Sequence, residues 1–231
     1  MSTLLITLGD SWTQGVGCYE PKLREKLNKG EATMQELFLG SFERFSKCSW
    51  PTHTSRILNA DVKNIALGGD ANSASAKRLV MGPYSGCKKY YDDVIVVFLM
   101  TDPTRFSFFN DHIIQSFQPG SDSSVFMEEF LKHCLSVSED ENSEALFYLN
   151  VVKNFCDVNE YHFYYGSAFH KDITLPKSTS FLHPGCSAIV DILPNEVDYM
   201  SDICYHPNEL GYQFIGNYIG NYIKQDLTNK M

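Results

Sequence analysis

Short stretches near both ends of this chain contain side chains that could act together as a nucleophile, a base and an acid. Ser11 comes after an apolar run and Gly9, which places it at a tight turn between a strand and a helix. His206 stands directly before Pro207 and so belongs to a loop, with Asp202 upstream in the same loop. A serine hydroxyl becomes a nucleophile when a neighbouring base takes its proton and an acid orients that base. Ser11, His206 and Asp202 are therefore candidates for nucleophilic catalysis.

Another stretch contains Gly68 and Gly69 immediately after a second predicted strand. A glycine N–H can approach a ligand closely because no Cβ is in the way, so Gly69 is a candidate to bind an oxyanion. The side-chain amide of Asn72 could point at the same place. Each stretch alone also has a plain structural interpretation: Ser11 as a helix cap, His206 as a solvated loop residue, and the glycines as an ordinary turn.

Motifs for a bound cofactor are incomplete or missing. Gly15 and Gly17 begin a dinucleotide-binding fingerprint, but Glu20 occupies the place of its third glycine. His162, His170 and His183 are too far apart in the sequence to suggest a metal site, and no two cysteines have the Cys-x-x-Cys spacing of a zinc site. We therefore expect neither a metal nor an organic cofactor.

The candidate residues must be positioned by the elements that the apolar pattern predicts. Strands are expected over 3–8, 61–69, 92–101 and 160–169, and helices over 49–60, 73–81, 124–137, 142–158 and 208–226. Strands and helices that alternate in this way predict a parallel sheet with helices on both faces. The expected fold class is α/β, a three-layer α/β/α sandwich with a flavodoxin-like parallel sheet of about four or five strands. Sites in such folds lie at the carboxyl ends of the strands, where Ser11 and Gly69 are expected.

Length and composition set the broad class of protein. The 231 residues predict a single domain over 1–231, with insertions at about 18–48 and 103–140. The net charge of −9 disfavours nucleic acid as a partner, because phosphates would be repelled. No apolar run is long enough to span a membrane, and no signal peptide precedes the first strand. We therefore expect a cytoplasmic protein with no membrane partner, while association with a virion or release by lysis stays open.

Taken together, these stretches resemble the sequence blocks of the SGNH (GDSL-type) hydrolases. The string LGDSW matches the first block, with Ser11 as nucleophile, and NIALGGDAN matches the second, with Gly69 as oxyanion glycine. DICYHPNELG matches the last block, with His206 as base and Asp202 as its partner. The resemblance implies ester hydrolysis by acyl transfer on the α/β/α fold, without a cofactor. A weaker likeness, in the strings around Gly68 and Arg105, is to divergent members from tailed bacteriophages.

The third block departs from the family pattern. It usually reads Gly-x-Asn-Asp, and its Asn donates to the oxyanion, whereas here LMTDPT puts Asp102 in the Asn place. An ionised Asp only accepts hydrogen bonds and would repel an oxyanion. Three explanations stay open: Asn72 or Thr101 replaces the donor, Asp102 is protonated or paired with Arg105, or the protein is a weak or inactive enzyme.

The last block has one residue more than usual between its acid and its base. The family spacing is Asp-x-x-His, and here three residues separate Asp202 from His206. A bulge is needed for the Asp202 carboxylate to reach Nδ1 of the imidazole. Asp198 is the alternative partner.

The resemblance implies a serine esterase or deacetylase that hydrolyses a small acyl ester, for example an O-acetyl group on a carbohydrate. The alternative is a catalytically weak or inactive module of the same fold, which has a binding or structural role in a larger assembly such as a virion. Intact Ser11, Gly69 and His206 favour the enzyme, and Asp102 with the irregular acid spacing favours the alternative. The oligomeric state stays open.

Overall fold

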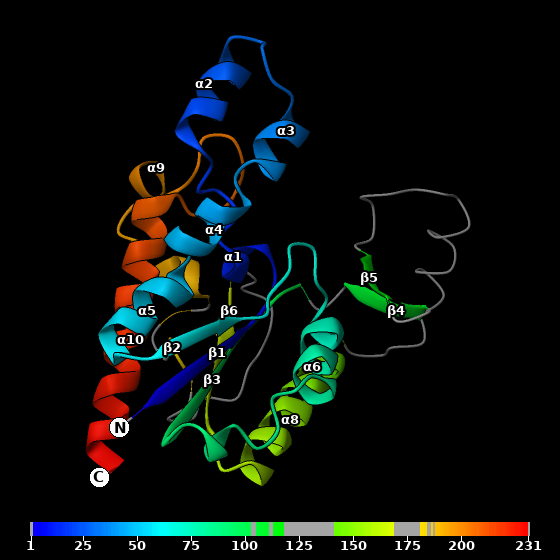
Figure 1. Ribbon diagram of the computed structural model, residues 1–231, viewed down its shortest axis with the longest axis vertical. Helices are drawn as coiled ribbons and strands as arrows, with labels where there is room; N and C mark the ends of the chain where they lie inside the picture. Colours follow the sequence, from blue (N-terminus) through cyan, green and yellow to red (C-terminus); the bar gives the residue numbers. More distant parts are fainter. Residues whose placement is uncertain are drawn as a thin grey trace.

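The computed structural model describes residues 2–102, 105–110, 113–117, 141–168, 181–183, 186 and 188–230. In this part of the chain a parallel sheet lies between two layers of helices (Figure 1). The predicted three-layer α/β/α class is confirmed. The predicted organisation as a single domain with two insertions stays a prediction.

The sheet contains β1 (Thr3–Leu8), β2 (Asp61–Asn64), β3 (Asp93–Met100) and β6 (His162–Ser167) in the order β2-β1-β3-β6. All neighbouring pairs are parallel, and Leu5 is in register with Val62 and Ile95. The four strands follow the flavodoxin-like order, in which the first strand lies between the second and the third. β3 is buried along almost its whole length, as its unbroken apolar run predicts for a strand covered on both faces.

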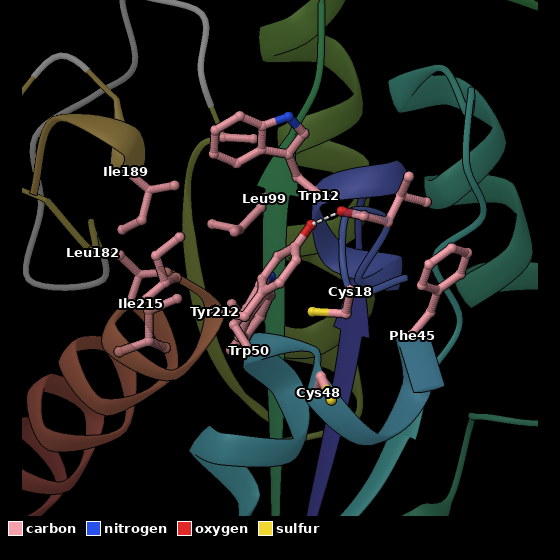
Figure 2. Packing of buried hydrophobic residues seen from close by; sticks show 14 of the residues in the cluster. Trp12, Cys18, Phe45, Cys48, Trp50, Leu99, Leu182, Ile189, Tyr212 and Ile215 are labelled. Atoms are coloured by element: carbon pink, nitrogen blue, oxygen red, sulfur yellow. Dashed lines mark hydrogen bonds between the residues drawn. The ribbon is translucent and has the colours of Figure 1, made fainter. Parts of the chain in front are cut away.

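Helices cover the two faces of the sheet separately. α5 (Trp50–Leu58) and α10 (Glu209–Lys230) pack on one face, and α6 (Asn72–Met81) and α8 (Glu141–Val158) pack on the other (Figure 1). Alternate residues of β1 and β3 point to opposite faces, so each strand contributes to both apolar clusters. Figure 2 shows the first cluster, where Tyr212 of α10 donates its hydroxyl to the carbonyl oxygen of Val16 at 2.7 Å.

Glycines let α10 approach α5 closely. A Cβ added to Gly216 would lie 2.5 Å from Cβ of His53 and 2.7 Å from the carbonyl oxygen of Trp50. The hydroxyl of Thr54 donates to the carbonyl oxygen of Gly216 at 3.0 Å. This close contact holds α10 against α5, and it therefore also holds the loop that leads into α10.

The expected insertion at 18–48 contains helices that the apolar pattern did not predict. They are α2 (Pro21–Asn28), α3 (Met34–Leu39) and α4 (Phe42–Cys48). α3 begins at a capping box, in which Thr33 and Glu36 exchange side-chain and backbone hydrogen bonds. Apolar side chains of this segment, among them Phe45, join the cluster that packs on α10.

The expected insertion at about 103–140 contains two strands that the apolar pattern did not predict. β4 (Phe106–Asn110) and β5 (Ile113–Phe117) pair as an antiparallel hairpin. The helix predicted over 124–137 lies outside the described residues. Shorter elements are α1 (Ser11–Gln14), η1 (Cys87–Lys89), η2 (Ile189–Ile192) and α9 (Glu196–Tyr199). Within the part that the structure describes, no helix has the length and apolar character to cross a membrane.

Candidate active site

Ser11 is the first residue of α1, and Gly9 and Asp10 separate it from the carboxyl end of β1. The helix is capped by Asp10, whose Oδ1 accepts from the N–H of Trp12 at 3.0 Å. Because Asp10 caps the helix, the hydroxyl of Ser11 is not needed for this role. Gly9 adopts a φ of +146°, so this turn uses a backbone conformation that favours glycine.

His206 meets Ser11 across the carboxyl edge of the sheet. Its Nε2 lies 2.7 Å from Oγ of Ser11, a distance at which a neutral imidazole can accept the hydroxyl proton. The loop that carries His206 enters α10 through Pro207 and Asn208. It also packs on Gly17, where an added Cβ would lie 2.4 Å from the carbonyl oxygen of Pro207.

The surroundings of His206 favour its neutral form. Burial lowers the pKa of His206 below its ordinary value, the charge of Asp10 opposes this shift, and the charge of Arg105 reinforces it. The ring of Trp12 lies on one side of the imidazole, with 6.2 Å between the ring centroids. At neutral pH the imidazole is therefore a base ready to accept a proton.

The structure does not bring Asp202 to His206. The Asp202 carboxylate forms an ion pair with Arg24 of α2, and its side chain is 68% exposed. Nδ1 of His206 is buried, and no hydrogen-bond partner is found for it among the described residues. Asp198, the other candidate acid, instead accepts from the side-chain amide of Asn195 at 3.0 Å.

A glycine turn after β2 lies beside the serine. A Cβ added to Gly68 would be 3.6 Å from Cβ of Ser11, and the N–H of Gly68 donates to Oε1 of Gln14 at 2.8 Å. Gly69 follows with a φ of +82°, and an added Cβ there would meet nothing within 4 Å. Gly68 therefore packs beside Ser11, and Gly69 faces open space.

A buried ion pair holds this turn in place. Oδ2 of Asp70 accepts from Nη1 of Arg78 at 2.5 Å and from the N–H of Leu67 at 3.1 Å. Burial raises the pKa of Asp70, and the hydrogen bonds from Arg78 oppose that shift. Because Asp70 bonds back to Leu67, it closes the turn that contains Gly68 and Gly69.

Asn72 and Thr101, which we considered as replacement oxyanion donors, bond to each other. The N–H of Thr101 donates to Oδ1 of Asn72 at 2.9 Å, and Nδ2 of Asn72 donates to the carbonyl oxygen of Thr101 at 3.1 Å. The Thr101 hydroxyl donates to Oδ2 of Asp10 at 2.7 Å. Both side chains are buried and tie α6 to the end of β3 instead of pointing into open space.

Asp102 and Arg105 follow β3 at the same edge of the sheet. Asp102 is partly exposed, and its carbonyl oxygen accepts from the N–H of Arg105 at 3.2 Å. The guanidinium of Arg105 forms its ion pair with Asp10, where Nη1 donates to Oδ2 at 2.8 Å. Sequence reasoning considered Arg105 only as a partner for Asp102. It missed the Asp10 contact, although a buried Asp next to the serine calls for a nearby cation.

The comparisons with known proteins concern the fold. No protein-family model matches the chain, and no curated protein sequence matches it. Among solved structures, the chain is similar to the lipase Lip_vut3 from a goat rumen metagenome, at 14% identity and a TM-score of 0.48, covering 96% of this chain and 97% of the lipase. It is similar to the psychrotrophic esterase EstA from Pseudoalteromonas sp., at 13% identity and a TM-score of 0.41, covering 99% and 100%. It is also similar to the acetyl xylan esterase Est2A from the rumen bacterium Butyrivibrio proteoclasticus, at 14% identity and a TM-score of 0.44, covering 98% and 65%.

Proposed function

We propose that the protein is a serine ester hydrolase whose reacting pair is Ser11 and His206. The contact of 2.7 Å between Nε2 of His206 and Oγ of Ser11 carries this proposal, because the two residues are 195 positions apart in the chain. A neutral imidazole at this distance can remove the hydroxyl proton as the oxygen attacks. The same contact is the one expected from the resemblance to SGNH hydrolases.

The reaction proceeds in two acyl-transfer steps. Oγ of Ser11 attacks the ester carbonyl carbon while Nε2 of His206 takes its proton, and His206 then gives that proton to the leaving alcohol oxygen. Water, activated by the same imidazole, releases the acid from the acyl-enzyme and restores Ser11. We assign the oxyanion to the N–H groups of Ser11 and Gly69, because Gln14 accepts from the N–H of Gly68 and Asp10 accepts from that of Trp12.

The substrate that we propose is a small acyl ester, with an O-acetyl group on a carbohydrate as the first candidate. The resemblance of the sequence blocks supports this choice, and the open space beside Gly69 is compatible with a small acyl group. Asp202 is not part of the proposed pair, because it binds Arg24 and leaves Nδ1 of His206 without an acid.

An alkyl fluorophosphonate tests the proposal directly. It phosphonylates an activated serine, so mass spectrometry of the digested protein is expected to find the adduct on Ser11. Ser11→Ala is expected to abolish both labelling and turnover of p-nitrophenyl acetate, while Ser46→Ala, a change at an exposed serine of α4, leaves both unchanged. Absence of a Ser11 adduct together with equal turnover by wild type and Ser11→Ala would refute the proposal.

The alternative is a binding or structural module that keeps the fold without the reaction. The unpartnered Nδ1 of His206 favours it, because in an efficient triad an acid holds this nitrogen. The same labelling experiment separates the two functions. A folded protein whose Ser11 does not react with the fluorophosphonate supports the module.

A further inference from the structure

Arg105 joins the loops that follow β1, β2 and β3. Its Nη1 donates to Oδ2 of Asp10 at 2.8 Å and lies 3.4 Å from the carbonyl oxygen of Asp70. Asp10 precedes Ser11, and Asp70 ends the turn that contains Gly69. The Arg105 side chain is only 11% exposed, and its Nε is buried with no hydrogen-bond partner among the residues described.

We propose that Arg105 is a positioning residue for this site, which holds the serine and glycine loops together and neutralises the buried Asp10 carboxylate beside Ser11. Its role in turnover rests on the proposed esterase function. Its effect on the electrostatics of the site does not depend on turnover and can be measured separately.

Charge balance beside Ser11 is the first argument. Asp10 is fully buried, and its carboxylate accepts from Trp12, Thr101 and Arg105. Without Arg105 it would be a buried negative charge next to the atom on which the reaction builds an oxyanion, and like charges repel strongly at low dielectric. With Arg105 the pair is neutral overall, so Asp10 no longer places a net negative charge beside Ser11.

Geometry at the strand ends is the second argument. The nucleophile and the oxyanion N–H groups come from different loops, and a misplacement of about 1 Å can cost roughly 10²-fold in rate. A single guanidinium that contacts both loops fixes their separation. Other hydrogen bonds between these parts of the chain include Gly68 N–H to Gln14 and the Ser75 hydroxyl to the carbonyl oxygen of Gly9.

Among the residues that the structure describes, Asp10 raises the pKa of His206 by its charge and Arg105 lowers it. The Ser11 hydroxyl and the Trp12 ring are its neutral neighbours. Removal of the Arg105 charge therefore leaves Asp10 unopposed and raises the pKa of His206. A role limited to holding the fold together would not move this value in a folded variant.

The test compares Arg105→Gln and Arg105→Lys with Arg56→Gln, which removes the same charge from an exposed position on α5. For p-nitrophenyl acetate, Arg105→Gln is expected to lower kcat by about 100-fold with KM within about threefold, and Arg105→Lys to recover about tenfold of that loss. NMR titration of the His206 imidazole is expected to show a higher pKa in Arg105→Gln, a smaller rise in Arg105→Lys and no change in Arg56→Gln.

Several outcomes would overturn the inference. One is wild-type kcat in folded Arg105→Gln, and another is a loss of rate with an unchanged His206 pKa. If Arg105→Gln does not fold, Arg105→Lys decides: full activity with an unchanged His206 pKa overturns the inference, and a slower kcat with a shifted pKa supports it. If wild type hydrolyses no ester and its Ser11 is not labelled, the proposed function fails. In that case the NMR titration of His206 alone tests whether Arg105 controls the electrostatics of the site.

Discussion

Asp10, and not Ser11, caps the helix that follows the first strand, and this division of roles leaves the Ser11 hydroxyl to His206. The meeting of Ser11 and His206 could be predicted from the sequence. Ser11 follows a parallel strand, His206 lies in the loop before the last helix, and such loops gather at one edge of the sheet. The environment of the acid could not be predicted, because Arg24, which binds Asp202, lies on α2, a helix that the sequence pattern did not predict.

The position of Asp202 leads to a residue-scale prediction. Asp202→Asn removes an exposed ion pair with Arg24 and no contact with His206, so kcat/KM for p-nitrophenyl acetate is expected to stay within about threefold of wild type. The melting temperature is expected to change little, because exposed ion pairs contribute about 0–1 kcal/mol.

The matched control is Asp198→Asn, which changes the other candidate acid, an exposed residue that bonds to Asn195. A loss of about 10²-fold or more in Asp202→Asn alone would contradict the prediction. It would mean that the carboxylate leaves Arg24 and reaches Nδ1 during turnover.

At the scale of elements, the central strands were predictable because their apolar runs are long and unbroken. β3 is the clearest case, since seven of its eight residues are buried. The helices of 18–48 were not predicted, and few of their residues are buried: none in α2, Leu37 in α3, and Phe45 and Cys48 in α4. So few buried positions give no long apolar stripe from which a helix could be recognised. The hairpin of β4 and β5 was missed because it lies within the segment over 103–140 that was predicted only as an insertion.

The contact between α10 and α5 leads to an element-scale prediction. Gly216→Ala places a methyl group 2.7 Å from the carbonyl oxygen of Trp50, which is backbone and cannot turn away. The helices must separate, and the free energy of unfolding is expected to fall by about 1–3 kcal/mol in urea titrations. Because α10 carries the His206 loop at its start, kcat is expected to fall as well.

The control for this change is Asn217→Ala, which introduces the same side chain at the next, exposed position of α10. It is expected to change the free energy of unfolding by no more than about 0.5 kcal/mol. Equal stability of the Gly216 and Asn217 variants would show that α10 has room to accept the methyl group.

At the scale of the whole molecule, buried imidazoles link folding to pH. Burial lowers the pKa of His53 on α5, of His183 beside β6 and of His206 at the site. The fully buried His183 bonds on both sides: Nε2 accepts from the N–H of Ser167 at 2.9 Å, and Nδ1 lies 3.1 Å from the carbonyl oxygen of Cys186. Only a neutral imidazole can make both hydrogen bonds.

These lowered pKa values determine the direction of the pH dependence. Below the unfolded value of about 6.5, the unfolded chain binds protons at these histidines that the folded chain does not bind. The free energy of unfolding is therefore expected to fall as pH decreases from about 7 towards 5, by up to about 1.4 kcal/mol per histidine and pKa unit.

His183→Gln is expected to lower stability at about pH 8, because it disrupts the hydrogen bonds of the imidazole, and to weaken the dependence of stability on pH. Urea titrations across this range, with Asn217→Ala as a control that titrates no group, measure both effects. If the free energy of unfolding of His183→Gln depends on pH as strongly as that of wild type, His183 does not contribute to this pH dependence.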